Sequence, residues 1–342
     1  MKVKQRLISF DLLKLFAIFL VLWGHCIQYL LHDNPFDNPV FMSIYAFHMP
    51  LFMMMSGFFS RKTLSNKKPL EIIKNKFLEL VLPCISVGAI LLGGYFIKTC
   101  CIDASAISSL YETFNAVIVK DLWFLKSLFC CFLLATLAYS GKKHLYVKLG
   151  LTVLLSFFLN FYMLKRMYLF FVAGILLNAN IELFKKHARM IFLGSLAGFL
   201  LLLSTYDKTI YLTQIGDVKD AVMAADGNMI IHTIGSFFHN ITTGLLGCTT
   251  FISLFYTLDQ LFSASGLSRL AKMGQYTLGI YILQYVILER NLAPLIHCED
   301  SALFNFLIAP LLSVILVVGC YLLTRLIEQK RAAAFFILGK HK

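Results

Sequence analysis

A line of polar and ionisable side chains runs through the first long apolar stretch of the chain. Asp11, Lys14, His25 and Gln28 fall on one face of an α-helix, because each residue turns a helix by about 100°. Asp11 and Lys14 have the i,i+3 spacing of an ion pair, and His25 would lie about 16 Å further along the axis. This face is either a helix-packing seam or the wall of a polar channel that leads to a histidine.

A second histidine, His48, opens the next apolar stretch in the segment Tyr45–Pro50. If the two helices are antiparallel neighbours, His48 lies at a depth similar to that of His25. The pair would then be a base and its partner, or a substrate site, although a histidine near a membrane surface also serves in packing. Further polar side chains inside apolar stretches are Lys126, Arg166, Tyr281 and Gln284.

The elements that hold these residues are predicted to be membrane-spanning helices. Of the 342 residues 59% are apolar and 14% are charged, and the mean hydropathy is +0.76, whereas soluble domains carry about 25% charged residues. A span needs about 20 mostly apolar residues. Ten stretches qualify, near residues 8–31, 43–60, 78–97, 121–140, 147–163, 166–181, 188–205, 231–258, 274–289 and 304–325. We therefore predict an all-α bundle of about ten spans, forming a single membrane domain over residues 1–342.

Charge asymmetry predicts the orientation of these spans. With ten spans and an inside N-terminus, the inside segments carry 22 of the 31 Lys and Arg residues, as the positive-inside rule requires. Both termini are then cytoplasmic. The formal net charge of +13 follows from topology, so membrane lipids rather than nucleic acid are the expected partners. The nine cysteines lie mostly in apolar stretches without a C-x-x-C spacing, and no metal site is expected.

A basic segment follows the second predicted span. It contains Arg61, Lys74 and Lys76 among six Lys and Arg residues over 61–76. Positive-inside topology and anionic lipid explain these charges by themselves. The more specific alternative is that these Lys and Arg side chains bind the phosphates of a cytoplasmic donor substrate.

The sequence resembles the acyltransferase-3 family of integral-membrane O-acyltransferases. The resemblance rests on four ordered segments: Arg6–Lys14 followed by His25, Phe47–Phe58 with its FHMPLF and SGF parts, Leu122–Leu125, and Gly274–Leu283. The chain departs from the family pattern in two places. Gln284 stands where the family often has His, and Glu79 replaces the second charge of a basic R-x-x-R element.

The resemblance implies a stand-alone enzyme of the bacterial cytoplasmic membrane. It would transfer an acyl group, commonly acetyl, from acyl-CoA to a sugar hydroxyl of a surface glycan or lipid-linked sugar, with no bound cofactor. His25, Asp11, Lys14 and His48 would be catalytic. The donor would be held by Arg61, Lys74 and Lys76, and the acceptor by Trp123, Lys126, Arg166, Tyr281 and Gln284.

Two questions about mechanism and function stay open at the level of sequence. His25 either deprotonates the acceptor hydroxyl or first accepts the acyl group itself. The alternative function is a multi-span transporter or flippase that uses the same polar line as a path. A third possibility is a non-catalytic membrane partner.

Overall fold

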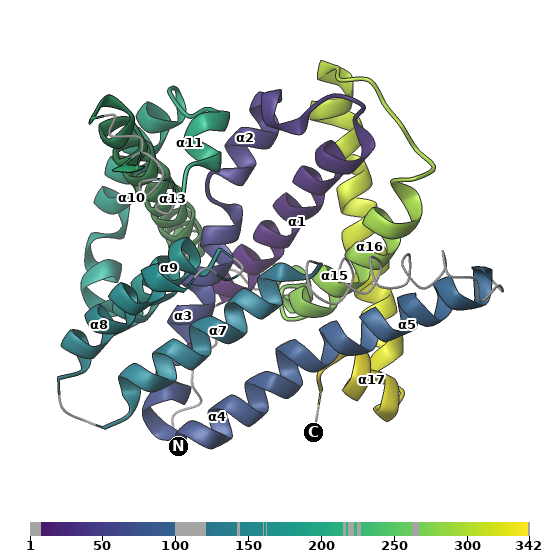
Figure 1. The fold of residues 1–342 in the computed structure, drawn as a ribbon, viewed down its shortest axis with the longest axis horizontal. Coiled ribbons are helices and arrows are strands. Elements are labelled where there is room, and N and C mark those ends of the chain that lie inside the picture. The colour runs from purple at the N-terminus through teal and green to yellow at the C-terminus, as the bar shows by residue number, and fades with distance from the viewer. Residues whose placement is uncertain are drawn as a thin grey trace. The chain divides into compact units, whose positions relative to one another are not determined.

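The computed structural model describes residues 8–99, 121–141, 144–159, 161, 163–214, 217, 222–223, 227–261 and 267–340. These residues are almost entirely helical (Figure 1) and contain no β-strand, only an isolated β-bridge between Leu31 and Cys298. The predicted all-α fold class is therefore confirmed. By their contacts the residues divide into two compact units.

The first unit comprises the chain up to residue 59 together with residues 170–321. Three helices begin in one unit and end in the other, namely α3 (His48–Asn66), α9 (Leu164–Ala179) and α16 (Ala309–Glu328). The remaining elements of the first unit are α1 (Ile8–Leu30), η1 (Pro35–Asp37), α2 (Pro39–Tyr45), α10 (Ile181–Leu203), α11 (Lys208–Leu212), α13 (Gly227–Leu261), α14 (Ser268–Met273), α15 (Thr277–Gln284), η5 (Tyr285–Leu292) and η6 (Phe304–Ile308).

The second unit comprises residues 60–169 and the chain from residue 322. Its elements are α4 (Pro69–Lys76), η2 (Phe77–Val81), α5 (Leu82–Thr99), α7 (Trp123–Tyr139), α8 (Leu145–Phe158) and α17 (Arg331–Leu338). Pro69 stands at the first position of α4, where its missing N–H costs no hydrogen bond. Gly339 ends α17 with a φ of 65°, a conformation that glycine adopts without a Cβ clash.

Six helices in the described ranges are long and apolar enough to cross a membrane. They cover Ile8–Leu30, Pro39–Asn66, Pro69–Gly94, Ile181–Leu203, Gly227–Gln260 and Phe304–Glu328. The other four predicted spans correspond to shorter elements: α7, α8 and α9 have 17, 14 and 16 residues, and the stretch 274–289 is divided between α15 and η5. The count of ten and the cytoplasmic termini stay predictions.

Helix α16 shows why these helices suit a lipid environment. Its exposed face carries Leu311, Ile315, Leu322 and Leu326, each more than half exposed, at a spacing that places them along one side of the helix. Val317 and Ser313 lie on its buried side. A row of bare aliphatic side chains is unfavourable in water and favourable in hydrocarbon.

Helices α3 and α9 approach each other so closely within the first unit that only glycine fits at the contact. A Cβ built on Gly57 would lie 1.9 Å from the carbonyl oxygen of Phe171, and one built on Gly174 would lie 1.9 Å from that of Met54. Small residues at membrane helix contacts let backbones pack directly, where dispersion rather than the hydrophobic effect supplies the attraction. The contact fixes the register of α3, whose first residue is His48.

Candidate functional site

The first part of α1 carries the ion pair that the sequence predicts. Lys14 Nζ lies 3.6 Å from Asp11 Oδ1 and 4.1 Å from the centre of the Phe59 ring. Asp11 is buried, and Gln275 donates a hydrogen bond of 3.4 Å to its other carboxylate oxygen. Gly274 allows this approach, because a Cβ there would lie 1.9 Å from the Asp11 carbonyl oxygen. The predicted polar face thus packs on protein, where a carboxylate next to a lysine and a π face stabilises the ammonium charge.

His25 lies in the last third of α1 and meets two acceptors on the α15–η5 segment. Its Nδ1 lies 3.0 Å from Gln284 Oε1 and 3.1 Å from Glu289 Oε1. Gln284 in turn donates to the same Glu289 oxygen over 3.0 Å. The side chains of His25 and Glu289 are 13% and 14% exposed, so the pair is shielded from water while the imidazole keeps some access.

The partners of His25 decide which of its nitrogens can act as a base. Both groups near Nδ1 are acceptors, so the tautomer assigned from this network carries its hydrogen on Nδ1. The lone pair is then on Nε2, for which the described residues provide no hydrogen-bond partner. This is the arrangement of a histidine held by a carboxylate on one side and available for proton transfer on the other.

Glu289 is the partner of His25 that sequence reasoning missed. In an α-helix, residues five apart are turned by about 500°, which leaves Gln284 and Glu289 about 140° apart. The segment η5 is instead a π-helix, in which the Ala293 N–H bonds to the Leu288 carbonyl over 2.8 Å. That i→i+5 pattern brings residues five apart to the same side. The sequence signal for Glu289 was its position as the last residue of the ninth predicted span, 274–289. There it was interpreted as a charge of the following outer loop and not as a residue inside the bundle.

His48 belongs to an aromatic cluster next to the His25 segment. It is buried, and its Nδ1 lies 2.9 Å from the Ile44 carbonyl oxygen. The Tyr45 ring is 4.4 Å from the His48 ring, and the Tyr45 hydroxyl donates to Gln28 on α1. Gly24 makes room for this tyrosine, because a Cβ there would lie 2.6 Å from its ring. His25 contacts Gln284 and Glu289, whereas Tyr45 and Gln28 join the end of α2 to α1.

Four of the predicted acceptor residues fall in two groups. Tyr281 is buried on α15, one turn before Gln284. The second unit holds Trp123, the first residue of α7, and Arg166 in the first turn of α9. Lys126 on α7 donates to the Asp121 carbonyl over 2.7 Å, so its ammonium reaches back toward the helix start. Acceptor binding by these residues stays a prediction.

The predicted donor residues all lie in the second unit. Lys76 forms an ion pair with Glu79 and lies 4.7 Å from the Phe132 ring centre. The acidic residue that replaces the second charge of the family's R-x-x-R element therefore neutralises the first. Lys74 is exposed on α4, and Arg61 is half-buried on α3. Of the three cations, Lys74 is the most accessible to an incoming phosphate.

These features define a multi-pass membrane protein with a shielded histidine–carboxylate site between helices. A family model described as an acyltransferase domain matches residues 7–325. The chain therefore belongs to the acyltransferase-3 family, which confirms the resemblance.

Curated relatives match shorter parts of the chain. The nodulation protein NolL of Sinorhizobium fredii (strain NBRC 101917 / NGR234) is 30% identical over 140 residues, which cover 39% of this chain and 37% of that protein. The protein of the same name from Mesorhizobium japonicum (strain LMG 29417 / CECT 9101 / MAFF 303099) is 39% identical over 84 residues, or 24% and 22% of the two chains. The chain thus spans little more than a third of the first relative and less than a quarter of the second. No solved structure matches it.

Proposed function

We propose that this acyltransferase uses acyl-CoA, with acetyl as the group moved, and esterifies a sugar hydroxyl of a cell-surface glycan or lipid-linked sugar. The observation that carries the proposal is the contact of His25 Nδ1 with Glu289 and Gln284. A sugar hydroxyl is almost un-ionised near neutral pH, so its attack on a thioester needs a positioned base. An imidazole with a free Nε2 and an anchored Nδ1 supplies one.

The proposed reaction moves one proton and one acyl group. Nε2 of His25 takes the hydroxyl proton as the hydroxyl oxygen attacks the thioester carbonyl carbon. The carbon–sulfur bond then breaks, and the proton passes from Nε2 to the departing sulfur, giving the ester and the free thiol. Glu289 faces the imidazolium that exists between these two transfers, and a carboxylate at hydrogen-bond distance stabilises that charge.

An acyl-histidine route uses the same residues in a different order. Nε2 attacks the thioester carbon first and the thiolate leaves. The acceptor hydroxyl oxygen then attacks the acyl carbon, the bond from that carbon to Nε2 breaks, and the hydroxyl proton passes to the thiolate, which gives the same ester and thiol. The anchored Nδ1 serves either route. Incubation with acetyl-CoA and no acceptor distinguishes them, since only the second route leaves an acetyl group on a peptide that contains His25.

Substrate contacts are assigned by charge and position. Lys14, held by Asp11, provides a fixed positive charge on the same helix as His25 for the polar part of the donor. Arg61, Lys74 and Lys76 would contact the donor phosphates. Aromatic and polar side chains would bind the sugar, which stacks on rings and donates hydrogen bonds; we assign this role to His48, Trp123, Lys126, Arg166, Tyr281 and Gln284.

The proposed location is the cytoplasmic membrane of a bacterium. Acyl-CoA is made in the cytoplasm, whereas a surface glycan lies outside, so a single site between membrane helices must accept both. The apolar outer face of α16 and the six long apolar helices in the described ranges support placement in a bilayer.

The test uses the full chain purified in detergent, radiolabelled acetyl-CoA and a panel of oligosaccharide acceptors. We expect label in the acceptor, and a loss of about a hundredfold or more for His25→Ala, the usual contribution of a general base. His232→Ala is the matched control, because His232 is exposed on α13. Equal turnover by His25→Ala contradicts the mechanism. Movement of an unmodified solute across vesicles without acetyl transfer would favour the transporter.

A further inference from the structure

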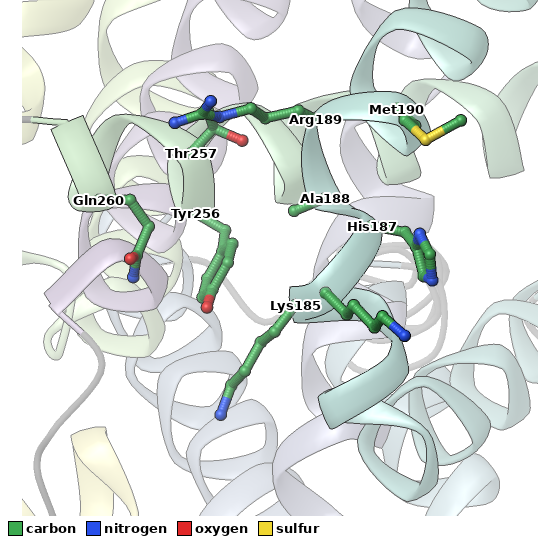
Figure 2. A pocket seen from close by; sticks show the side chains of 9 residues that line it. Lys185, His187, Ala188, Arg189, Met190, Tyr256, Thr257 and Gln260 are labelled. Atoms are coloured by element: carbon green, nitrogen blue, oxygen red, sulfur yellow. The ribbon is translucent and has the colours of Figure 1, made fainter.

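A cavity of about 440 Å³ lies between one end of α10 and one end of α13, and none of its lining residues belongs to the His25 site. Ribbon and side chains in Figure 2 show that its walls come from these two helices. The volume is within the range of small-molecule sites. The polar residues that line it are Lys185, Lys186, His187, Arg189, Tyr256, Thr257 and Gln260.

The charge of this lining is of one sign. Lys185, Lys186 and Arg189 are cationic at neutral pH, and none of the lining residues is Asp or Glu. Lys185 also contacts Glu182 at 2.8 Å, but that carboxylate side chain is 82% exposed and outside the lining. A concave surface with three cations and no carboxylate attracts anions, because the cavity concentrates their field.

The opposite wall supplies neutral hydrogen-bonding groups. Tyr256 packs edge-on against Phe184 with ring centres 6.0 Å apart, which fixes the ring while its hydroxyl remains at the cavity. Gln260 adds an amide on the next turn of α13, and Arg189 extends from α10 toward this wall in Figure 2. The planar fork of a guanidinium donates to two oxygens of a tetrahedral phosphate, and nearby hydroxyl and amide donors suit its remaining oxygens.

The position of the cavity along the helices points to the membrane surface. Both helices are candidate spans, and the cations precede the long apolar part of α10. Met190 lines the cavity and is 74% exposed, and Leu183 and Leu193 nearby are 63% and 65% exposed. The cavity therefore borders bare apolar surface at the ends of two candidate spans, where lipid phosphates would lie if both helices cross a bilayer. Basic pockets between membrane helices on the cytoplasmic side bind such head groups.

We propose that the α10–α13 cavity is a binding site for a phosphate ester, distinct from the histidine site. The phosphate belongs either to an anionic lipid head group or to a soluble nucleotide-like phosphate on the predicted cytoplasmic side. The proposal does not depend on acyl transfer. The competing explanation is that these cations serve only membrane topology, in which case their arrangement around a cavity has no consequence for binding.

The experiment compares two double variants of the full chain. Lys186→Gln with Arg189→Gln removes two cavity charges. Lys330→Gln with Arg331→Gln removes the same residue types from exposed positions beside α17. Each protein, checked by size-exclusion chromatography and thermal unfolding, is tested with phosphatidylglycerol by native mass spectrometry and with adenosine 3′,5′-bisphosphate by titration calorimetry.

We expect wild type and the α17 variant to bind at least one probe equally, and the cavity variant to bind it about tenfold or more weakly. Retention of phosphatidylglycerol alone identifies a lipid site, and binding of the bisphosphate identifies a soluble ligand. The proposal is overturned if wild type binds neither probe, or if both variants lose binding equally. Should the cavity variant fail to fold, Arg189→Lys takes its place, with a smaller loss expected because the charge remains and the planar fork is removed.

Discussion

Glu289 offers the sharpest test of how this site handles charge. His25 Nδ1 lies 3.1 Å from Glu289 Oε1. The substitution Glu289→Gln keeps the size of the side chain and its ability to accept a hydrogen bond from this nitrogen. It removes the negative charge that faces the imidazole. The uncharged amide of Gln284 donates a hydrogen bond to the same oxygen. The side-chain carbonyl of the substituted glutamine can still accept that bond.

The expected loss follows from the change in that single hydrogen bond. In the transition state the imidazole has gained a proton, and its bond to Glu289 becomes charge-assisted, a class that contributes about 1.5–3 kcal/mol. Since each 1.36 kcal/mol corresponds to a factor of ten in rate, kcat should fall roughly tenfold to 150-fold. The charge forms only during reaction, so KM for acetyl-CoA should change little.

The assay is steady-state acetyl transfer from radiolabelled acetyl-CoA by purified full-length protein, at several donor concentrations. Glu299→Gln is the matched control, because Glu299 is the same residue type on an exposed loop. Elution volume and thermal unfolding show whether each variant keeps its fold. A kcat for Glu289→Gln equal to that of wild type, with the fold intact, refutes the role of the carboxylate. A change confined to KM would place Glu289 in substrate binding instead.

Three further substitutions test the framework of the site. Gly57→Ala should lower the stability by about 1–3 kcal/mol and the melting temperature by several degrees, because the new Cβ would lie 1.9 Å from a backbone carbonyl of α9. Asn38→Ala should cost about 1 kcal/mol of stability, measured by the same thermal unfolding, because its side chain accepts two backbone N–H groups at the start of α2, each over 3.0 Å. Asp11→Asn should lower acetyl transfer about fivefold, because Lys14, at 3.6 Å, loses a partly exposed ion pair of about 1 kcal/mol.

For each of these three predictions, one result would contradict the physical reason given. Gly319→Ala is the control for the helix contact, since nothing lies within 4 Å of a Cβ built there; equal melting temperatures for both glycine variants would show that α3 and α9 can separate freely. An unchanged melting temperature for Asn38→Ala would mean that water replaces the cap. Asp33→Asn is the control for Asp11→Asn, because Asp33 is exposed, and it should leave the rate of acetyl transfer unchanged. If Asp11→Asn also leaves that rate unchanged, Asp11 does not have the role assigned to it.

The arrangement of α1 was predictable because it depends on one helix alone. The 100° period of an α-helix places Asp11 and Lys14 within pairing distance, and the structure confirms the pair. Hydropathy likewise locates helices in most of the ten stretches. It does not show that the stretch 274–289 is divided between α15 and η5, because hydropathy does not distinguish an α-helix from a π-helix.

The partner of His25 was not predictable by the same reasoning. Gln284 stood out as a polar residue within an apolar stretch, but Glu289 could join it only through the i→i+5 bonding of η5. Neither hydropathy nor α-helical periodicity indicates where an α-helix changes to a π-helix. The similar depth of His25 and His48 stays a prediction, whereas the structure shows that the ring beside His48 is that of Tyr45, with ring centres 4.4 Å apart.

The π-helical turn of η5 also makes the site sensitive to chain length. A turn of this kind accommodates one residue more than an α-helix would in the same axial distance. Deleting a single residue such as Val286 would let the helix rewind into ordinary geometry, carrying the carboxylate about 100° away from the imidazole. Relatives that gained or lost one residue here would therefore hold their histidine differently, even if every surrounding side chain were identical.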